Sequence, residues 1–396
     1  MNIAQCIPFF ILACLALPFA PKTVWAQTSL DSLLRPYLDG SGLPAVAAAV
    51  AKNGKIVAAG AVGSRRAGAD IPVTPNDRFH IGSDTKAMTA LLAAMLVEEG
   101  KLRWDSTPAA LFPEFASGMD AGFASVTLRQ LLSHSAGLPR DNEDVAAVWK
   151  EALFQDGNLD AIRCFIVEQW SKKPLASPPG TKFEYSNMGY VVAGAMIERA
   201  AAKTWDELIV ERVFTPLALT TAGLGCQATL GRVDAPLGHV LAEGKTQAVL
   251  AGLNCDNPAY LGPAGIAHLS ILDFARWASW NAGEGKRGPA LVRPETMRAL
   301  HAPVVSLPQE AQAKSDGKNP RDGYGLGWGV VNVDFASHPL LQHGGSNNKN
   351  LAHIWVDVKN DLAIVIAANI AGEKADAALH AIARTLYAQY AAAKVH

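Results

Sequence analysis

Four short apolar runs of strand length lie near the two ends of this 396-residue chain. Ala45 to Ala51 and Ile56 to Val62 flank Asn53-Gly54, a dipeptide that favours the tight turn of a β-hairpin. Leu351 to Val358 and Leu362 to Ala368 form a second such pair, with a short polar turn between them. Apolar runs of this length bounded by turn residues are typical of buried strands. Both ends of the chain are therefore predicted to supply strands.

A longer apolar run predicts a helix. Between Ser83 and Glu99 apolar residues occupy all sides of a helical repeat, which is typical of a helix buried all round. The stretch from Lys101 to Leu300 continues with helical patterns interrupted by loops. Further helices are predicted over Asp160 to Trp170, Gly189 to Ala201, Thr204 to Val213 and Glu373 to Tyr390.

Strands at both ends with helices between them predict an α+β fold. We expect one antiparallel sheet built from both termini and flanked by helices, with a mainly helical region inserted. The predicted boundaries place residues 27–82 and 321–396 in the sheet domain and residues 83–320 in the helical region.

The N-terminal segment has the pattern of a signal peptide. Cys6 to Ala20 is almost wholly apolar, and small residues at Val24 and Ala26 predict cleavage after Ala26. Residues 1–26 are thus predicted to direct export to the periplasm or the medium, with no stable membrane span after cleavage. Two alternatives stay open: the segment is retained as an anchor, or Cys14 belongs to a lipoprotein cleavage box.

Composition narrows the function classes. The net charge is −1 and no basic run occurs, so we expect no nucleic-acid partner. Ten scattered histidines, without a Cys-x-x-Cys or His-Glu-x-x-His spacing, predict no metal site, and no cofactor is expected. Cys164, Cys226 and Cys255 lie beyond the leader, and a disulfide between the last two is left open, as is the oligomeric state.

The start of the buried helix carries candidate chemistry. Ser83 and Lys86 stand three residues apart, so both side chains lie on one helical face. A buried lysine can lose its proton near neutral pH and act as a base toward a serine nucleophile, and N–H groups of the first turn can hold an oxyanion. A plain serine and lysine at a helix start is the alternative. Ser315 and Lys318 repeat the spacing in a polar stretch that reads as loop.

Two further polar motifs lie far along the chain. Tyr185-Ser186-Asn187 precedes a predicted helix, and His343-Gly344-Gly345-Ser346 precedes the strand at Leu351. Each has a structural reading on its own: a half-buried tyrosine, an asparagine helix cap, a glycine turn and a surface histidine.

In this order the three motifs resemble those of the penicillin-recognising serine hydrolases. With a tyrosine in the second motif, the chain resembles the branch that contains class C β-lactamases, their DD-peptidase relatives and related carboxylesterases. The resemblance covers most of the chain beyond the leader. It extends to Phe79-x-Ile81-Gly82 before Ser83, Leu131 to Pro139, Pro179-Gly180, Pro263-Ala264-Gly265 and Tyr324 to Trp328.

The resemblance implies a role for each motif residue. Ser83 would form an acyl-enzyme with an ester or amide carbonyl of a small-molecule or peptide substrate, after Lys86 takes its proton. Tyr185 would share the acid and base work. Asn187 would orient Lys86 and the substrate. The N–H groups of Ser83 and Ser346 would form the oxyanion hole, with Gly345 allowing a close approach. His134 is interpreted as structural.

One departure bears on the substrate. Where β-lactamases and peptidases of this superfamily usually carry Lys-Thr-Gly, this chain has His343-Gly344-Gly345. A histidine is mostly neutral at pH 7 and offers no fixed charge to a substrate carboxylate, which favours an ester or amide over a β-lactam or D-alanyl peptide. A DD-peptidase or β-lactamase and a non-catalytic scaffold remain alternatives. An α/β-hydrolase is disfavoured, because Ser133 stands where its nucleophile elbow needs glycine.

Overall fold

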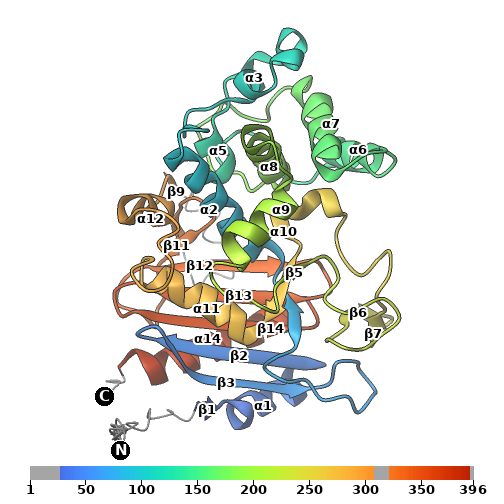
Figure 1. Ribbon diagram of the computed structural model, residues 1–396. Helices are drawn as coiled ribbons and strands as arrows, with labels where there is room; N and C mark the ends of the chain where they lie inside the picture. Colours follow the sequence, from blue (N-terminus) through green and yellow to red (C-terminus); the bar gives the residue numbers. More distant parts are fainter. Residues whose placement is uncertain (1–26, 307–320, 393–396) are drawn as a thin grey trace, which may run out of the picture.

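The computed structural model describes residues 27–306 and 321–392, and it contains one large mixed sheet (Figure 1). The sheet has nine strands, and every described pairing is antiparallel except that of β1 with β3. The predicted leader and the second Ser-x-x-Lys match lie outside the described residues. In spatial order the strands are β1 (Thr28–Ser29), β3 (Lys55–Gly63), β2 (Ala45–Lys52), β14 (Leu362–Ala368), β13 (Leu351–Asp357), β12 (Leu340–Ser346), β11 (Gly329–Val331), β10 (Arg321–Tyr324) and β9 (Val305–Ser306).

The centre of the sheet joins the two ends of the chain, as predicted. β2 from the N-terminal part pairs with β14 from the C-terminal part along its whole length. Asn53 and Gly54 both have positive φ angles, 52° and 79°, in the turn between β2 and β3. This turn fits the right-handed twist of the two strands. The predicted α+β architecture is confirmed.

Both faces of the sheet are covered, which explains the unbroken apolar runs. Along β2, Ala47 and Ala49 belong to the core on one face, whereas Val46 and Val50 belong to the core on the other. Helices α1 (Asp31–Ser41) and α14 (Glu373–Ala391) cover the second face. Helix α11 (Ile271–Ala282) covers the first (Figure 1). A strand buried on both faces needs apolar residues at every position rather than an alternating pattern.

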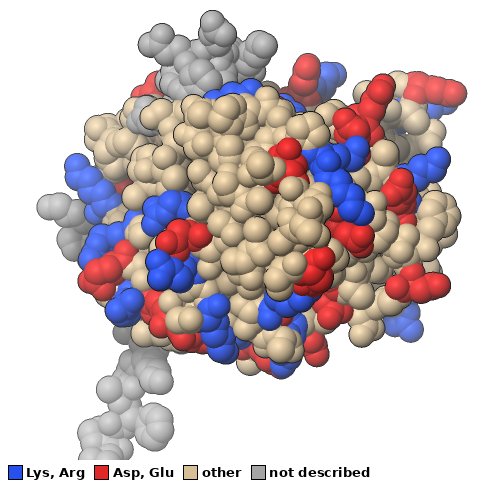
Figure 2. All heavy atoms as spheres, turned by 90° about the horizontal axis from the view of Figure 1, so that it is seen from above, with Lys and Arg blue, Asp and Glu red and all other residues tan. Residues whose placement is uncertain are grey.

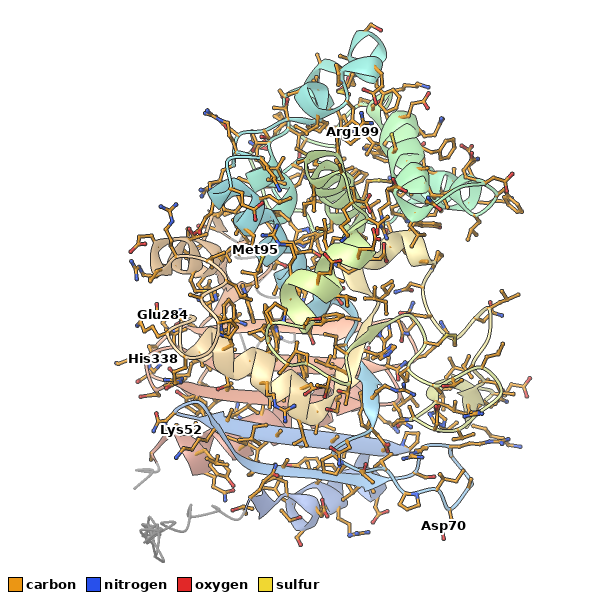
Figure 3. The ribbon with its side chains drawn as sticks, viewed as in Figure 1. Lys52, Asp70, Met95, Arg199, Glu284 and His338 are labelled. Atoms are coloured by element: carbon orange, nitrogen blue, oxygen red, sulfur yellow. A yellow bond between two sulfur atoms is a disulfide. The ribbon has the colours of Figure 1, made fainter. Side chains whose placement is uncertain are left out.

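Helix α2 (Thr85–Glu98) is the centre of the helical layer above the sheet. Its residues from Thr85 to Leu96 are all buried, as its pattern predicted. Figure 3 labels Met95 on this helix. The surrounding helices are α3 (Pro108–Leu111), α4 (Ala121–Ala124), α5 (Leu128–Leu132), α6 (Glu143–Ala152), α7 (Leu159–Ser171), α8 (Asn187–Ala201), α9 (Trp205–Ile209), α10 (Gly262–Gly265) and α12 (Pro294–His301).

Three local details differ from the sequence expectation. Ser83 lies in a 3₁₀ turn (Gly82–Asp84) just before α2 rather than inside it, because Gly82 has a left-handed φ of 51°. The helix predicted from Thr204 ends as a π-helical turn after Ile209. The motif at His343 precedes the strand at Leu351 as predicted, but it lies on a strand of its own, β12, which was not predicted. The boundaries between a sheet domain and a helical region stay a prediction, and α11 within 83–320 packs on the sheet.

Smaller elements close one side of the molecule. Strands β4 (Arg78–His80), β8 (Ala267–Ser270) and β5 (Gly223–Leu224) form a three-stranded sheet, and β6 (Gly238–Ala242) pairs with β7 (Lys245–Val249). Cys226 and Cys255 form a disulfide beside them, with 5.7 Å between their Cα atoms. This pairing was open from the sequence.

The surface has no large field of one sign on the face seen from above. Lys and Arg side chains are interspersed there with Asp and Glu (Figure 2), in keeping with a net charge of −1. Within the described part of the chain, no helix combines the length and the apolar character needed to cross a bilayer.

Candidate active site

Ser83 and Lys86 meet where α2 begins. The Lys86 Nζ lies 3.0 Å from the Ser83 Oγ. Lys86 is fully buried, whereas Ser83 is partly exposed. A buried amine thus contacts a hydroxyl that solvent can reach, which is the arrangement that the three-residue spacing predicted.

Lys86 also donates hydrogen bonds to two oxygen acceptors. Its Nζ donates to the Asn187 Oδ1 at 2.9 Å and to the Ala264 carbonyl oxygen at 2.6 Å. Asn187 is the first residue of α8, and Ala264 belongs to α10. A neutral amine has two N–H groups and one lone pair. When these two acceptors take both N–H groups, the lone pair is left for the proton of Ser83.

The surroundings of Lys86 favour this neutral form. Burial lowers the pKa of Lys86 from its ordinary value of 10.5 to about 7, and the charges of Asp141 and Asp84 oppose the effect. The Asp141 Oδ2 also accepts a bond of 3.2 Å from the Asn187 Nδ2. Asp141 therefore acts on Lys86 both by charge and through Asn187, and it was not identified from the sequence, where it follows Pro139 and Arg140 in an ordinary loop pattern.

Tyr185 lies against the same lysine. The Lys86 Nζ is 4.8 Å from the centre of the Tyr185 ring. This ring also packs on His134, with 4.2 Å between ring centres. The His134 Nδ1 accepts a bond of 3.1 Å from the Ser186 N–H, and its carbonyl oxygen accepts one of 2.7 Å from the Glu184 N–H. His134 thus fixes the loop that carries Tyr185, in line with its interpretation as structural.

The end of β12 passes close to Ser83. The pairing of β12 with β11 stops at Gln342, and beyond it the strand, still paired with β13, approaches the turn that carries Ser83. A Cβ atom on Gly345 would overlap the Ile81 carbonyl oxygen and lie 2.7 Å from the Ser83 nitrogen. The glycine predicted to admit a substrate is therefore also required by backbone of this same chain. Ser346 follows it and is exposed.

His343 lies beneath this strand end rather than on its surface. The side chain is 4% exposed. Its Nε2 lies 2.9 Å from the Tyr324 Oη, and its Nδ1 lies 3.4 Å from the Asp84 Oδ1. Asp84 is fully buried, and burial raises its pKa well above the ordinary value, although the charge of Lys86 lowers it. The third motif thus places a histidine, in place of a lysine, beside the buried carboxyl of Asp84 behind the nucleophile.

Another histidine, His80, positions the turn before Ser83, and it was not identified from the sequence. The His80 Nδ1 accepts a bond of 3.0 Å from the Gly82 N–H. Its Nε2 lies 2.8 Å from the Asp256 Oδ1, which also accepts a bond of 3.0 Å from the Asn347 Nδ2. His80 is fully buried. Because Nδ1 is an acceptor, the ring proton must be on Nε2, facing the carboxylate.

A sequence profile described as Beta-lactamase matches residues 30–389 of this chain. The chain therefore belongs to the beta-lactamase family, as the three motifs predicted, and this is a family of hydrolases. Its assignment to the class C branch stays a prediction.

Two curated relatives are similar over most of the chain. Penicillin-binding protein 4 of Amycolatopsis lactamdurans is 27% identical over 291 residues, which cover 73% of this chain and 71% of that protein. Protein flp of Staphylococcus aureus (strain N315) is 24% identical over 353 residues, 88% of this chain. The match spans only 64% of the length of protein flp.

Solved structures share the fold at low identity. A penicillin-binding protein homologue from Pyrococcus abyssi, described as octameric, aligns with a TM-score of 0.71 at 24% identity, covering 90% of this chain and 76% of the other. EstCE1, a hydrolase with promiscuous acyltransferase activity, aligns with a TM-score of 0.73 at 19% identity, covering 90% and 97%. A D-amino acid amidase from Ochrobactrum anthropi SV3 aligns with a TM-score of 0.69 at 19% identity, covering 91% and 97%.

Proposed function

We propose that this protein is an exported serine hydrolase that cleaves an ester or amide bond through an acyl-enzyme on Ser83. The observation that carries the proposal is the 3.0 Å contact between the Ser83 Oγ and the Lys86 Nζ. Lys86 is the general base, since its pKa of about 7 leaves much of it neutral at physiological pH. Its two other partners direct the lone pair to Ser83.

The acylation step then follows in order. The Ser83 Oγ attacks the substrate carbonyl carbon while its proton passes to the Lys86 Nζ. The carbonyl electron pair moves onto oxygen, and the N–H groups of Ser83 and Ser346 stabilise the resulting negative charge. When the tetrahedral centre collapses, the bond to the leaving alcohol or amine breaks. The leaving group receives a proton from Lys86 through Tyr185, and the acyl group stays on Ser83.

Deacylation uses the same groups in reverse. Tyr185 and Lys86 take a proton from a water molecule, which attacks the acyl carbonyl carbon. The bond from this carbon to the Ser83 oxygen breaks, the serine regains its proton, and the carboxylic acid leaves. Tyr185, Asn187 and Ser346 are all at least partly exposed beside Ser83, so substrate and water can reach the site.

The third motif supports an uncharged ester or amide as substrate. His343 is buried against Tyr324 and Asp84, and no lysine stands at its position. A substrate carboxylate, such as that of a penicillin or a terminal D-alanine, would thus lack a fixed partner charge at this place. The structural similarity to EstCE1 and to a D-amino acid amidase agrees with this preference. The similarity to penicillin-binding protein 4 supports the alternative, a DD-peptidase or β-lactamase.

Labelling and kinetics test the proposal together. Wild type, Ser83→Ala and Ser125→Ala are treated with a fluorophosphonate probe and with a fluorescent penicillin. Ser125 is an exposed serine whose Oγ donates to the Gly122 carbonyl oxygen, so its removal controls for surface labelling. Labelling is expected in the wild type and in Ser125→Ala only. Absence of labelling in the wild type by both probes would instead favour a non-catalytic scaffold.

Turnover identifies the substrate class. Parallel kinetics on a p-nitrophenyl ester, nitrocefin and a D-alanyl peptide are expected to favour the ester. A preference for the peptide or for nitrocefin would select the alternative. Ser83→Ala is expected to abolish turnover, and a loss under about tenfold would refute the role of this serine.

Export is a separate part of the proposal. It is supported by the apolar run from Cys6 to Ala20 and by the small residues before position 27. The mass and N-terminal sequence of protein recovered from the periplasm or medium test it. A mature chain that begins at Gln27 is expected, and a chain retained in the cytoplasm with Met1 intact would refute export.

A further inference from the structure

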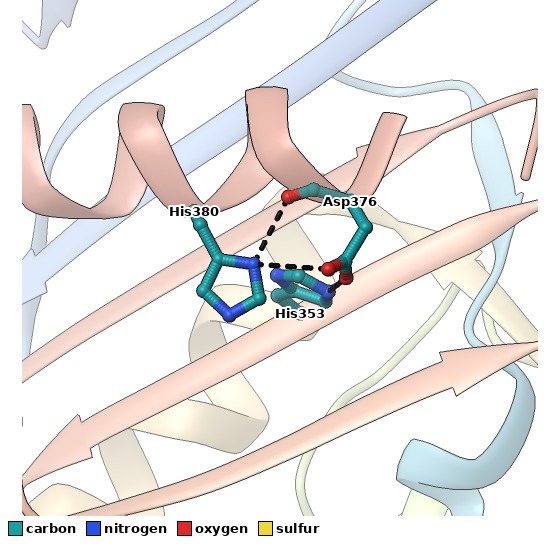
Figure 4. Close-up of side chains that lie close together, drawn as sticks. All are labelled: His353, Asp376 and His380. Carbon is teal, nitrogen blue, oxygen red and sulfur yellow. Dashed lines mark hydrogen bonds and ion pairs between the residues drawn. The ribbon is translucent and has the colours of Figure 1, made fainter. Parts of the chain in front are cut away.

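A cluster of two histidines and one aspartate lies on the α14 face of the sheet. His353 comes from β13, while Asp376 and His380 lie one turn apart on α14 (Figure 4). Each of the three residues offers one imidazole or carboxylate donor atom, and these atoms all lie within 4.8 Å of one another. The proposed hydrolytic step uses none of the three.

The donor atoms lie close to one another. The His353 Nε2 lies 2.9 Å from the Asp376 Oδ1, and the His380 Nδ1 lies 3.4 Å from the Asp376 Oδ2. A zinc ion with nitrogen and oxygen ligands at about 2.0–2.2 Å in tetrahedral geometry separates its donors by about 3.3–3.6 Å. Only small side-chain movements are therefore needed for all three to reach one ion. The two imidazole rings, with centres 4.6 Å apart, are held at 70° to each other.

We propose that His353, Asp376 and His380 form a binding site for a divalent transition metal ion such as Zn²⁺. Two imidazole nitrogens and one carboxylate oxygen suit zinc and its neighbours, whereas Ca²⁺ and Mg²⁺ prefer oxygen ligands alone. His353 is 3% exposed, but the side chains of Asp376 and His380 are 45% and 25% exposed. The site is thus anchored in the core and open to solvent, where water would complete the coordination.

The site joins two elements that the sequence keeps apart. His353 pairs with Gly344 in β12, next to the strand end that approaches Ser83. Asp376 and His380 are four residues apart, a spacing visible in the sequence, but only the fold adds His353. A bound ion would fasten α14 to β13 on the face opposite α11. The alternative is a hydrogen-bonded group that binds no metal, in which the His380 Nδ1 also contacts the Asp376 carbonyl oxygen at 3.0 Å.

Calorimetric titration of the tag-free, chelator-treated full chain with ZnCl₂ distinguishes a metal site from a hydrogen-bonded group that binds no metal. The proposal expects one zinc ion per chain, with an affinity at least tenfold weaker in His380→Gln and in Asp376→Asn. His338→Gln is the matched control, because the His338 Nε2 lies 2.8 Å from the Asp357 Oδ1 of the same sheet, and no second histidine among the described residues completes a three-ligand group there. Its zinc affinity is expected to equal that of the wild type. CaCl₂ is expected to give no binding in any of the proteins.

Two further readouts separate metal binding from a merely structural role. Zinc is expected to raise the Tm of the wild type with the logarithm of the zinc concentration, and to raise the Tm of His380→Gln less at every concentration. Co²⁺ in place of zinc is expected to give the visible absorption of a tetrahedral site in the wild type and in His338→Gln, but not in His380→Gln or Asp376→Asn. No zinc binding by the wild type, or equal affinity in wild type and His380→Gln, would overturn the proposal.

Discussion

The protonation state of Lys86 gives the sharpest prediction about the reaction. With a pKa of about 7, half of the lysine is neutral at pH 7 and about a tenth at pH 6. An exposed lysine with a pKa of 10.5 would be neutral in only about one molecule in three thousand at pH 7. Burial at the start of α2 thus raises the population of active base by roughly three orders of magnitude.

The acid limb of kcat/KM should follow this titration. For an uncharged ester, kcat/KM is expected to rise about tenfold per pH unit below pH 7 and to level off above it. Asp141→Asn removes a negative charge that raises the pKa of Lys86 but keeps an oxygen acceptor for Asn187. The limb should therefore move to lower pH in this variant.

Asp144→Asn is the control for this shift. Asp144 is an exposed carboxylate three residues further along, and it pairs with Lys173 at 2.7 Å. Its loss should leave the profile unchanged. Initial rates from pH 5 to 9 at substrate concentrations below KM provide the measurement. A level wild-type profile across this range, or movement of the Asp141→Asn limb to higher pH, would show that Lys86 is not the titrating base.

Three further predictions concern the glycines of β12, the histidine before Ser83 and the disulfide. Gly345→Ala should lower kcat/KM more than tenfold, because the added Cβ overlaps neighbouring backbone. Gly344→Ala is the control and should be tolerated, because its Cβ makes an ordinary 3.5 Å contact. Equal kinetics in the two variants would contradict this prediction. His80→Phe removes a buried hydrogen-bond acceptor and should lower the free energy of unfolding by about 1–3 kcal/mol. It should also lower kcat. Chemical denaturation and kinetics measure the two effects, and an unchanged kcat would refute the positioning role of His80. Replacing Cys226 and Cys255 by serine should lower the free energy of unfolding by about 3–4 kcal/mol for a sequence separation of 29; a denaturation midpoint unaffected by the change or by a reductant would argue against the disulfide.

The fold was predictable where local pattern and burial agree. The runs at Ala45 and Leu362 read as strands because both faces of the sheet are covered, and Asn53-Gly54 has the turn geometry that such a pair requires. The 3₁₀ turn at Ser83 could not be read from periodicity, since it depends on the left-handed φ of Gly82 and on the approach of β12.

The candidate site was predictable where one motif held both partners. Ser83 and Lys86 meet because a spacing of three residues, from the 3₁₀ turn into the first turn of α2, places them on one face. Asp141 and His80 were not identified, because their partners Asn187 and Asp256 lie far away in sequence and come near only in the folded chain. Single acidic or histidine residues in loops and strands carry no local pattern that separates them from surface residues.

The pairing of β2 with β14 has a consequence for how the chain folds. Val46 lies opposite Ala368, so almost the whole sequence separates two adjacent positions in the centre of the sheet. At roughly 5–20 residues per second, synthesis would leave the edge of β2 without its partner for roughly 15–60 s. Such long-range pairing forms slowly, and an open strand edge can associate with other chains in the meantime. A chain truncated before Leu362 is therefore expected to aggregate, even though it would still contain Ser83, Lys86 and Tyr185.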